Sequence, residues 1–98
     1  MNENICLLEL ENLRTELQKL DAEFIRLLSE RQRIACEIGA IKQRSGIPFE
    51  QPEIWNKHCL ERRKLAVASG VHPDLVSQVF ECIHRFSIDI QQHTTTDE

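Results

Sequence analysis

This 98-residue sequence contains no tyrosine, one tryptophan and four phenylalanines, so aromatic residues make up only 5% of it. Apolar residues as a whole reach 41%. A chain of this length and composition can bury a modest core, which falls short of what a large single-chain enzyme needs. We therefore expect one domain, residues 1–98, that gains from a second copy of itself.

Runs of basic residues are also absent, and the formal net charge is −4. This balance argues against nucleic acid or an anionic membrane as the partner. No stretch approaches the roughly 20 apolar residues of a membrane span, and the first residues lack the basic start and apolar core of a signal peptide. We expect a soluble, cytoplasmic protein in which any important cation acts locally.

The cysteines follow none of the spacings of a metal site or a redox motif. His58 lies beside Cys59 and His84 lies near Cys82, but neighbours at these spacings point in different directions on a helix. We expect reduced, packing cysteines, no metal site and no cofactor. The four cysteines are Cys6, Cys36, Cys59 and Cys82.

Proline and glycine are scarce, with three of each, and their positions divide the chain. Residues from about 5 to 45 contain no proline and a single glycine, and their apolar residues recur at three- and four-residue spacing. This pattern predicts one long helix. The segment SGIP at residues 45–48 should end it, because glycine supplies a left-handed cap and proline prevents continuation.

Two shorter helices are expected after this stop. Pro52 and Pro73 suit the first position of a helix, which predicts helices over about 52–69 and about 73–92, followed by a frayed tail at 93–98. No strand pattern is present, so the fold class is all-α with one long and two shorter helices. The expected inward stripes are Trp55, Cys59, Arg62 or Arg63, and Ala66 in the second helix, and Val76, Val79, Phe80, Ile83, Phe86 and Ile90 in the third.

The long helix should extend beyond any core that a single chain can form. About 40 helical residues at 1.5 Å each extend roughly 60 Å, whereas a 100-residue domain has a radius of gyration of about 13 Å. Its apolar stripe therefore needs cover, most economically from the same helix of a second copy in a two-fold dimer. A plain coiled coil is the alternative, although the heptads are imperfect.

Two cations lie within the apolar stripe of the long helix. At 100° per residue, Lys42 returns to within about 20° of Arg31, in the middle of the stripe. Arg14 lies at the edge of the stripe and too far along the helix to share a pocket with Arg31 of its own chain. In an antiparallel dimer it would reach the pocket of the partner.

The third helix also turns polar groups inward, with Ser87 inside its apolar stripe and Gln91 at the border. Buried cations are costly without a counter-charge, so either acidic side chains pair with Arg31 and Lys42 or a ligand does. Snorkelling or pairing with a nearby glutamate explains either cation alone. Together, two cations, a hydroxyl and an amide favour a small dianion held in a fixed pose over acid–base chemistry.

Four short motifs carry a resemblance to a known family. The order and spacing of these motifs resemble the all-helical chorismate mutases of the AroQ class, and the similarity covers nearly the whole chain. The motifs are L-R at Leu13-Arg14, E-R at Glu30-Arg31, I-G-x-x-K from Ile38 to Lys42, and S-x-x-x-Q from Ser87 to Gln91.

The resemblance implies an intertwined homodimer that converts chorismate to prephenate in the shikimate pathway of aromatic amino-acid biosynthesis. It also implies that Arg31 and the partner subunit's Arg14 bind the two carboxylates of the substrate. Lys42 and Gln91 would donate to the ether oxygen, and Ser87 would line the pocket near a carboxylate. Because this rearrangement needs no proton transfer, catalysis would rest on positioning and electrostatics.

One region departs from the family pattern. Many members read D-x-x-R-E after the first helix and hold the ring hydroxyl of the substrate with these residues, whereas this sequence has Gln51, Ile54 and Trp55. Gln51 can still hydrogen-bond a hydroxyl, and Trp55 is either a pocket wall or part of the core. The departure keeps three alternatives open: a 4-amino-4-deoxychorismate mutase, an isochorismate pyruvate lyase and a noncatalytic helical dimer.

Overall fold

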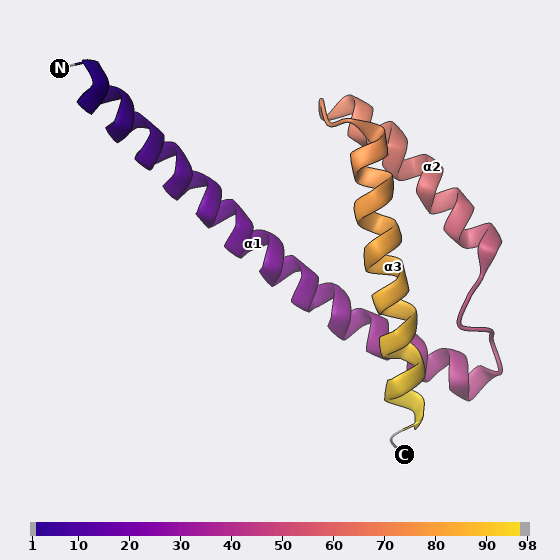
Figure 1. Ribbon diagram of the computed structural model, residues 1–98. Coiled ribbons are helices and arrows are strands. Elements are labelled where there is room, and N and C mark those ends of the chain that lie inside the picture. Colours follow the sequence, from indigo (N-terminus) through magenta and orange to yellow (C-terminus); the bar gives the residue numbers. More distant parts are fainter. Residues whose placement is uncertain (1, 97–98) are drawn as a thin grey trace. The chain divides into compact units, whose positions relative to one another are not determined.

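The computed structural model describes residues 2–96, which form three helices joined by two short connections (Figure 1). Helix α1 covers Asn2–Ser45, α2 covers Pro52–Ala68, and α3 covers Pro73–Thr96. The described residues contain no strand, and the predicted all-α fold class is confirmed. Within the same range, no helix is both long enough and apolar enough to cross a membrane.

Glycine ends the first two helices. Gly46 has a φ of 68° and Gly70 a φ of 74°, in the left-handed region that glycine adopts without steric cost. In both cases the amide of the next residue donates to the carbonyl five residues before it, at 2.9 Å. This hydrogen bond is typical of a Schellman motif, which satisfies a carbonyl that the helix end would otherwise leave free.

Proline begins the other two helices, with Pro52 in α2 and Pro73 in α3. The missing N–H of proline is harmless at a first helical position. Just before α3, the Nδ1 atom of His72 accepts a hydrogen bond from the Asp74 amide at 3.1 Å, which satisfies one of the free amides of the first turn.

The end of α3 differs from the sequence expectation. The helix continues to Thr96, past the expected end near residue 92, because the segment QQHTTT contains neither proline nor glycine to stop it. Residues 93–96, expected to fray, are therefore helical. Asp97 and Glu98, the rest of the expected tail, lie outside the described residues.

The chain divides into two units, Met1–Arg33 and Ile34–Glu98. The first unit is the N-terminal part of α1, and most of its described apolar side chains are exposed in the single chain. The exposed fraction is 61% for Leu13, 67% for Leu20 and 50% for Phe24. The chain by itself therefore leaves this stripe without cover.

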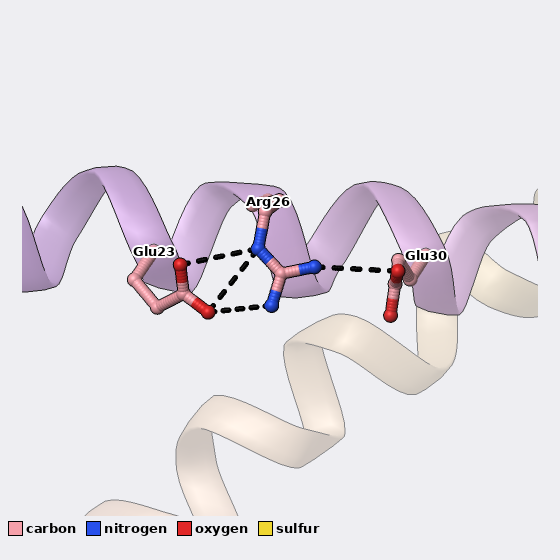
Figure 2. A network of polar contacts seen from close by, with 3 residues as sticks. All are labelled: Glu23, Arg26 and Glu30. Atoms are coloured by element: carbon pink, nitrogen blue, oxygen red, sulfur yellow. Dashed lines mark hydrogen bonds and ion pairs between the residues drawn. The ribbon is translucent and has the colours of Figure 1, made fainter.

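Arg26 forms a surface network with two glutamates in the first unit (Figure 2). Its Nη2 atom lies 2.5 Å from Oε1 of Glu23, and its Nη1 atom lies 3.3 Å from Oε1 of Glu30. The hydrogen bond from Arg26 lowers the pKa of Glu23 below its ordinary value. Because these side chains are three and four residues apart on one helix, the network supports the helix.

In the second unit, α2 and α3 lie side by side (Figure 1). Arg63 of α2 connects the two helices, because its Nη1 atom donates to Asp74 Oδ1 at 3.0 Å and to Ser77 Oγ at 2.9 Å, both on α3. The expected α2 stripe is confirmed, because its members are the residues of that helix that are not exposed: Trp55, Cys59, Arg62, Arg63 and Ala66.

The α3 stripe is confirmed except for one member. Phe86 is 65% exposed in the single chain. The other members are half-buried: Val76, Val79, Phe80, Ile83 and Ile90.

The four cysteines are free thiols. Cys36 and Cys59 are half-buried, whereas Cys6 and Cys82 are exposed in the single chain. The expected packing role therefore holds for the first pair only.

Candidate functional site

Gln91 of α3 is a buried polar residue, with only 5% of its surface exposed. It lies against Gly39 of α1 at very short range. A Cβ atom added to Gly39 would lie 2.9 Å from both Cα and Cβ of Gln91, which is closer than real Cβ contacts. The two helices can therefore approach here only because residue 39 has no side chain.

Lys42 lies one turn beyond Gly39 and reaches the same side chain. Its Nζ atom donates to Oε1 of Gln91 at 3.1 Å and to the carbonyl of Phe49 at 2.5 Å. The structure thus brings together two predicted site residues that are 49 positions apart in the sequence. Burial lowers the pKa of Lys42 below its ordinary value.

Both members of this pair keep donor capacity. The ammonium group of Lys42 has three protons, and two of them serve Phe49 and Gln91. Gln91 accepts through its amide oxygen, so its Nε2 protons remain for another acceptor. The pair can therefore present two N–H donors to one oxygen atom of a ligand.

Ser87 and Gln51 are both half-buried in the same unit. Ser87 lies one turn before Gln91 on α3. Gln51 immediately precedes α2, and its backbone carbonyl accepts a hydrogen bond from the Trp55 amide at 3.0 Å. Its side chain makes no capping hydrogen bond. The amide side chain of Gln51 is thus not needed to cap the helix.

Arg14 and Arg31, the predicted carboxylate-binding residues, lie on the part of α1 that belongs to the first unit. Both are exposed in the single chain. Their convergence with Lys42 and Gln91 stays a prediction.

A cluster of aromatic and basic side chains joins α2 to α3 beside this site. The ring centroids of Trp55 and His84 are 4.1 Å apart, with 27° between the ring planes. The guanidinium carbon of Arg62 lies 4.9 Å from the centre of the Trp55 ring and 4.5 Å from that of Phe80. Trp55, for which the sequence allowed a wall or a core role, is half-buried in this cluster.

His84 was not among the predicted site residues, because its sequence neighbour Cys82 suggested only a possible metal ligand. The spacing of His84 from two predicted site residues on the same helix could have indicated it. His84 precedes Ser87 by three residues and Gln91 by seven, so all three lie on one face of a helix.

A hollow of about 260 Å³ opens beside the stacked rings, lined by Trp55, Glu81, His84 and Arg85. Its walls combine aromatic surface with one acidic and one basic side chain. Among the described residues, no group of three or more histidine, cysteine or acidic side chains is placed to hold a metal ion.

The sequence matches the family described as "Chorismate mutase type II" over residues 13–92. This range includes every predicted site residue. The chain therefore belongs to the type II chorismate mutase family.

Three relatives differ in how much of their length the chain covers. The T-protein of Enterobacter agglomerans is 37% identical over 79 residues, which are 81% of this chain and 21% of that protein. The chorismate mutase of Methanocaldococcus jannaschii is 28% identical over 76 residues, or 76% of each chain. The bifunctional chorismate mutase/prephenate dehydratase of Aquifex aeolicus is 44% identical over 45 residues, or 46% of this chain and 12% of that protein.

The chain thus spans about a fifth of the length of the T-proteins that it matches. Its length is closer to that of the Methanocaldococcus jannaschii enzyme, of which the matched segment covers 76%.

Proposed function

We propose that this chain is a chorismate mutase, which rearranges chorismate to prephenate. Membership of the family and the relative named chorismate mutase support this activity. The observation that carries the proposal is the contact between Lys42 and Gln91, with N–H donors left over on both side chains. We also propose that the reaction takes place in the cytoplasm, as the sequence predicts.

The reaction is unimolecular, so the site needs no nucleophile, no general base and no cofactor. The ether C–O bond breaks while a C–C bond forms, and negative charge develops on the ether oxygen. The remaining N–H groups of Lys42 and Gln91 donate to that oxygen more strongly in the transition state than in the ground state. A well-placed donor of this kind contributes roughly 3–4 kcal/mol.

Holding the substrate in a reactive conformation is the second task of the site. Arg31 and the partner subunit's Arg14 bind the two carboxylates, and Ser87 lies near one of them. This arrangement requires a homodimer in which each site takes one arginine from the other chain. The exposed apolar stripe of the first unit supports such a dimer, because it offers a long surface for a second copy.

Two other substrates are alternatives, because the residues that bind the ring hydroxyl in many members of the family are replaced here by Gln51, Ile54 and Trp55. A mutase for 4-amino-4-deoxychorismate or a pyruvate lyase for isochorismate would use the same carboxylate-binding residues. Comparing kcat/KM for the three substrates separates these activities, and a clear preference for either analogue over chorismate would replace the proposal. Binding of chorismate without turnover of any of the three would indicate a noncatalytic dimer.

The assigned roles are tested by removing each donor. We expect Lys42→Ala and Gln91→Ala to lower kcat roughly 100- to 1,000-fold, because each variant loses a donor to the ether oxygen. The assay follows the loss of ultraviolet absorbance of chorismate, with prephenate identified by chromatography. Gln92→Ala is the matched control, since this neighbouring glutamine is exposed. Wild-type rates in either site variant would contradict the roles.

A further inference from the structure

His84 takes no part in the mechanism above, yet its ring is fixed beside the proposed site. Trp55 stacks against it at 4.1 Å, which sets the plane of the imidazole. On α3, His84 lies within about 20° of Gln91 and about 10 Å along the helix axis from it. The ether oxygen and the ring hydroxyl of chorismate lie on neighbouring ring carbons, so the side chains of Gln91 and His84 would converge on them from the two ends of this span.

The nitrogen atoms of this ring are available to a ligand. Within the part of the chain that the structure describes, neither nitrogen of His84 has a hydrogen-bond partner. In the same part, every fully enclosed side-chain nitrogen or oxygen does have a hydrogen-bond partner. The ring nitrogens are therefore not enclosed by protein. His84 lines the hollow of about 260 Å³, together with Trp55, Glu81 and Arg85.

The surroundings of His84 favour the neutral form of its ring. Burial lowers its pKa from the ordinary 6.5, Glu50 opposes the shift, and the charges of Arg62 and Lys42 lower the pKa further. These charges come from α1, from the connection to α2 and from α2 itself, while Glu81 and Arg85 line the hollow from α3. A neutral imidazole donates through one nitrogen and accepts through the other.

We propose that His84, held in place by Trp55, is a specificity-determining residue that hydrogen-bonds the ring hydroxyl of the substrate bound at Lys42 and Gln91. This inference rests on the proposed function. A hydroxyl both donates and accepts, and so it suits a neutral imidazole. The cations around His84 are Lys42, Arg62 and Arg85, and the carboxylates there are Glu50 and Glu81. Because the net charge is positive, a cationic substituent in the same place, such as the ammonium of 4-amino-4-deoxychorismate, is repelled. The site therefore selects chorismate over its amino analogue.

The first test is His84→Phe, which keeps an aromatic ring against Trp55 and removes both nitrogens. We expect KM for chorismate to rise roughly tenfold with a smaller change in kcat. The kcat/KM for the amino analogue should fall less, so the preference for chorismate narrows. If the role of His84 were purely structural, His84→Phe would lower kcat/KM for both substrates equally. His84→Gln, which can donate and accept, should recover part of the lost preference.

His58→Phe is the matched control, because His58 is exposed on α2 and does not line the hollow. It should leave KM and kcat/KM for both substrates unchanged. Unchanged KM and unchanged preference in a folded His84→Phe variant would overturn the inference. Circular dichroism and thermal melting show whether each variant folds.

A second measurement separates this inference from the proposed function. In the NMR spectrum of the wild-type protein, chorismate should shift the ring resonances of His84 and leave those of His58 in place. Shifts without turnover would refute the mutase activity and keep the contact with His84. Turnover without such shifts would refute the contact and keep the activity. Neither shifts nor turnover would refute both.

Discussion

The ammonium group of Lys42 is held by two acceptors of different kinds, a side-chain amide and a backbone carbonyl. Burial works against the charge, which is why the pKa of Lys42 is lowered. Its two hydrogen bonds favour the charged form, since only an ammonium group can donate to both acceptors and still keep a third proton. The proposed catalytic role depends on that third proton.

This dependence predicts the pH profile of the reaction. Lys42 must be protonated to donate, and a lowered pKa means that it loses its proton at a lower pH than an ordinary lysine. We expect kcat/KM to fall as pH rises through this lowered pKa, with a midpoint below the ordinary 10.5. A pH–rate profile from about pH 7 to about pH 11 measures it.

Lys42→Arg provides the control for that profile. The guanidinium group stays charged throughout this range, so the alkaline fall in kcat/KM should disappear even if the rate is lower. Activity that persists unchanged beyond pH 10.5, or an alkaline fall that remains in Lys42→Arg, would refute the assignment.

At the residue scale, the sequence indicated Lys42 as a cation within the apolar stripe of α1 and Gln91 as an amide at the border of the α3 stripe, and the family resemblance implied their roles. Neither helical periodicity nor the resemblance predicted the hydrogen bonds from Lys42 to Gln91 and to the Phe49 carbonyl, since these contacts depend on how the helices and the connection pack. His84 was overlooked for a related reason. The orientation of the His84 ring depends on stacking against Trp55, which belongs to a different helix. Helical periodicity describes one helix at a time and does not predict such a contact.

At the scale of the helices, Gly39 controls how closely α1 and α3 approach. A glycine inside a helix normally costs about 1 kcal/mol relative to alanine. This one is compensated by the contact that it allows with the backbone of Gln91. The same contact places Gln91 within reach of Lys42.

Gly39→Ala should therefore damage both packing and activity. The added methyl group would lie 2.9 Å from Cα of Gln91, so α3 must move. We expect the free energy of unfolding to fall by about 1–3 kcal/mol and kcat/KM to fall at least roughly tenfold. Denaturant unfolding and the chorismate assay measure the two effects.

Ala40→Val is the control, because Ala40 is exposed and its side chain can grow into open space. It should change both quantities little. If helix propensity alone mattered, Gly39→Ala would make the protein more stable and leave kcat/KM unchanged, which would contradict the packing argument.

The starts and ends of the helices were predictable wherever proline or glycine marks them. Pro52, Pro73, Gly46 and Gly70 act through their own backbone geometry, so the sequence indicates them directly. The end of α3 could not be placed in this way, because no such residue follows it within the described range. Polar composition alone indicated a frayed tail there, but it is a weaker signal than a helix-breaking residue.

At the scale of the whole molecule, the single chain buries little. Ala35 and Ala66 are its buried apolar residues within the described range, and none of the large side chains there is fully enclosed. Apolar side chains that remain exposed along a helix contribute nothing to stability until another surface covers them. The proposed homodimer would supply that surface.

Leu17→Glu tests the proposed dimer. Leu17 is 59% exposed in the single chain and belongs to the apolar stripe of α1. Burying a carboxylate in an apolar interface is costly, so we expect dissociation into monomers and loss of activity. Light scattering coupled to size exclusion measures the mass, and the chorismate assay measures the activity.

Gln18→Glu introduces the same charge one residue further on, at a position that is already polar. It should leave the dimer and its activity intact. A wild-type protein that is monomeric and fully active would refute both the dimer and the shared arginine.

The hydrogen bond from Lys42 to the carbonyl of Phe49 also determines which changes the connection between α1 and α2 can tolerate. A backbone carbonyl is present whatever the side chain, so residue 49 is free to vary during evolution while the acceptor persists. The number of residues between Gly46 and Pro52 has no such freedom, because an insertion or deletion would move the acceptor away from Lys42. Divergent members of this lineage should therefore differ in the composition of this connection and agree in its length.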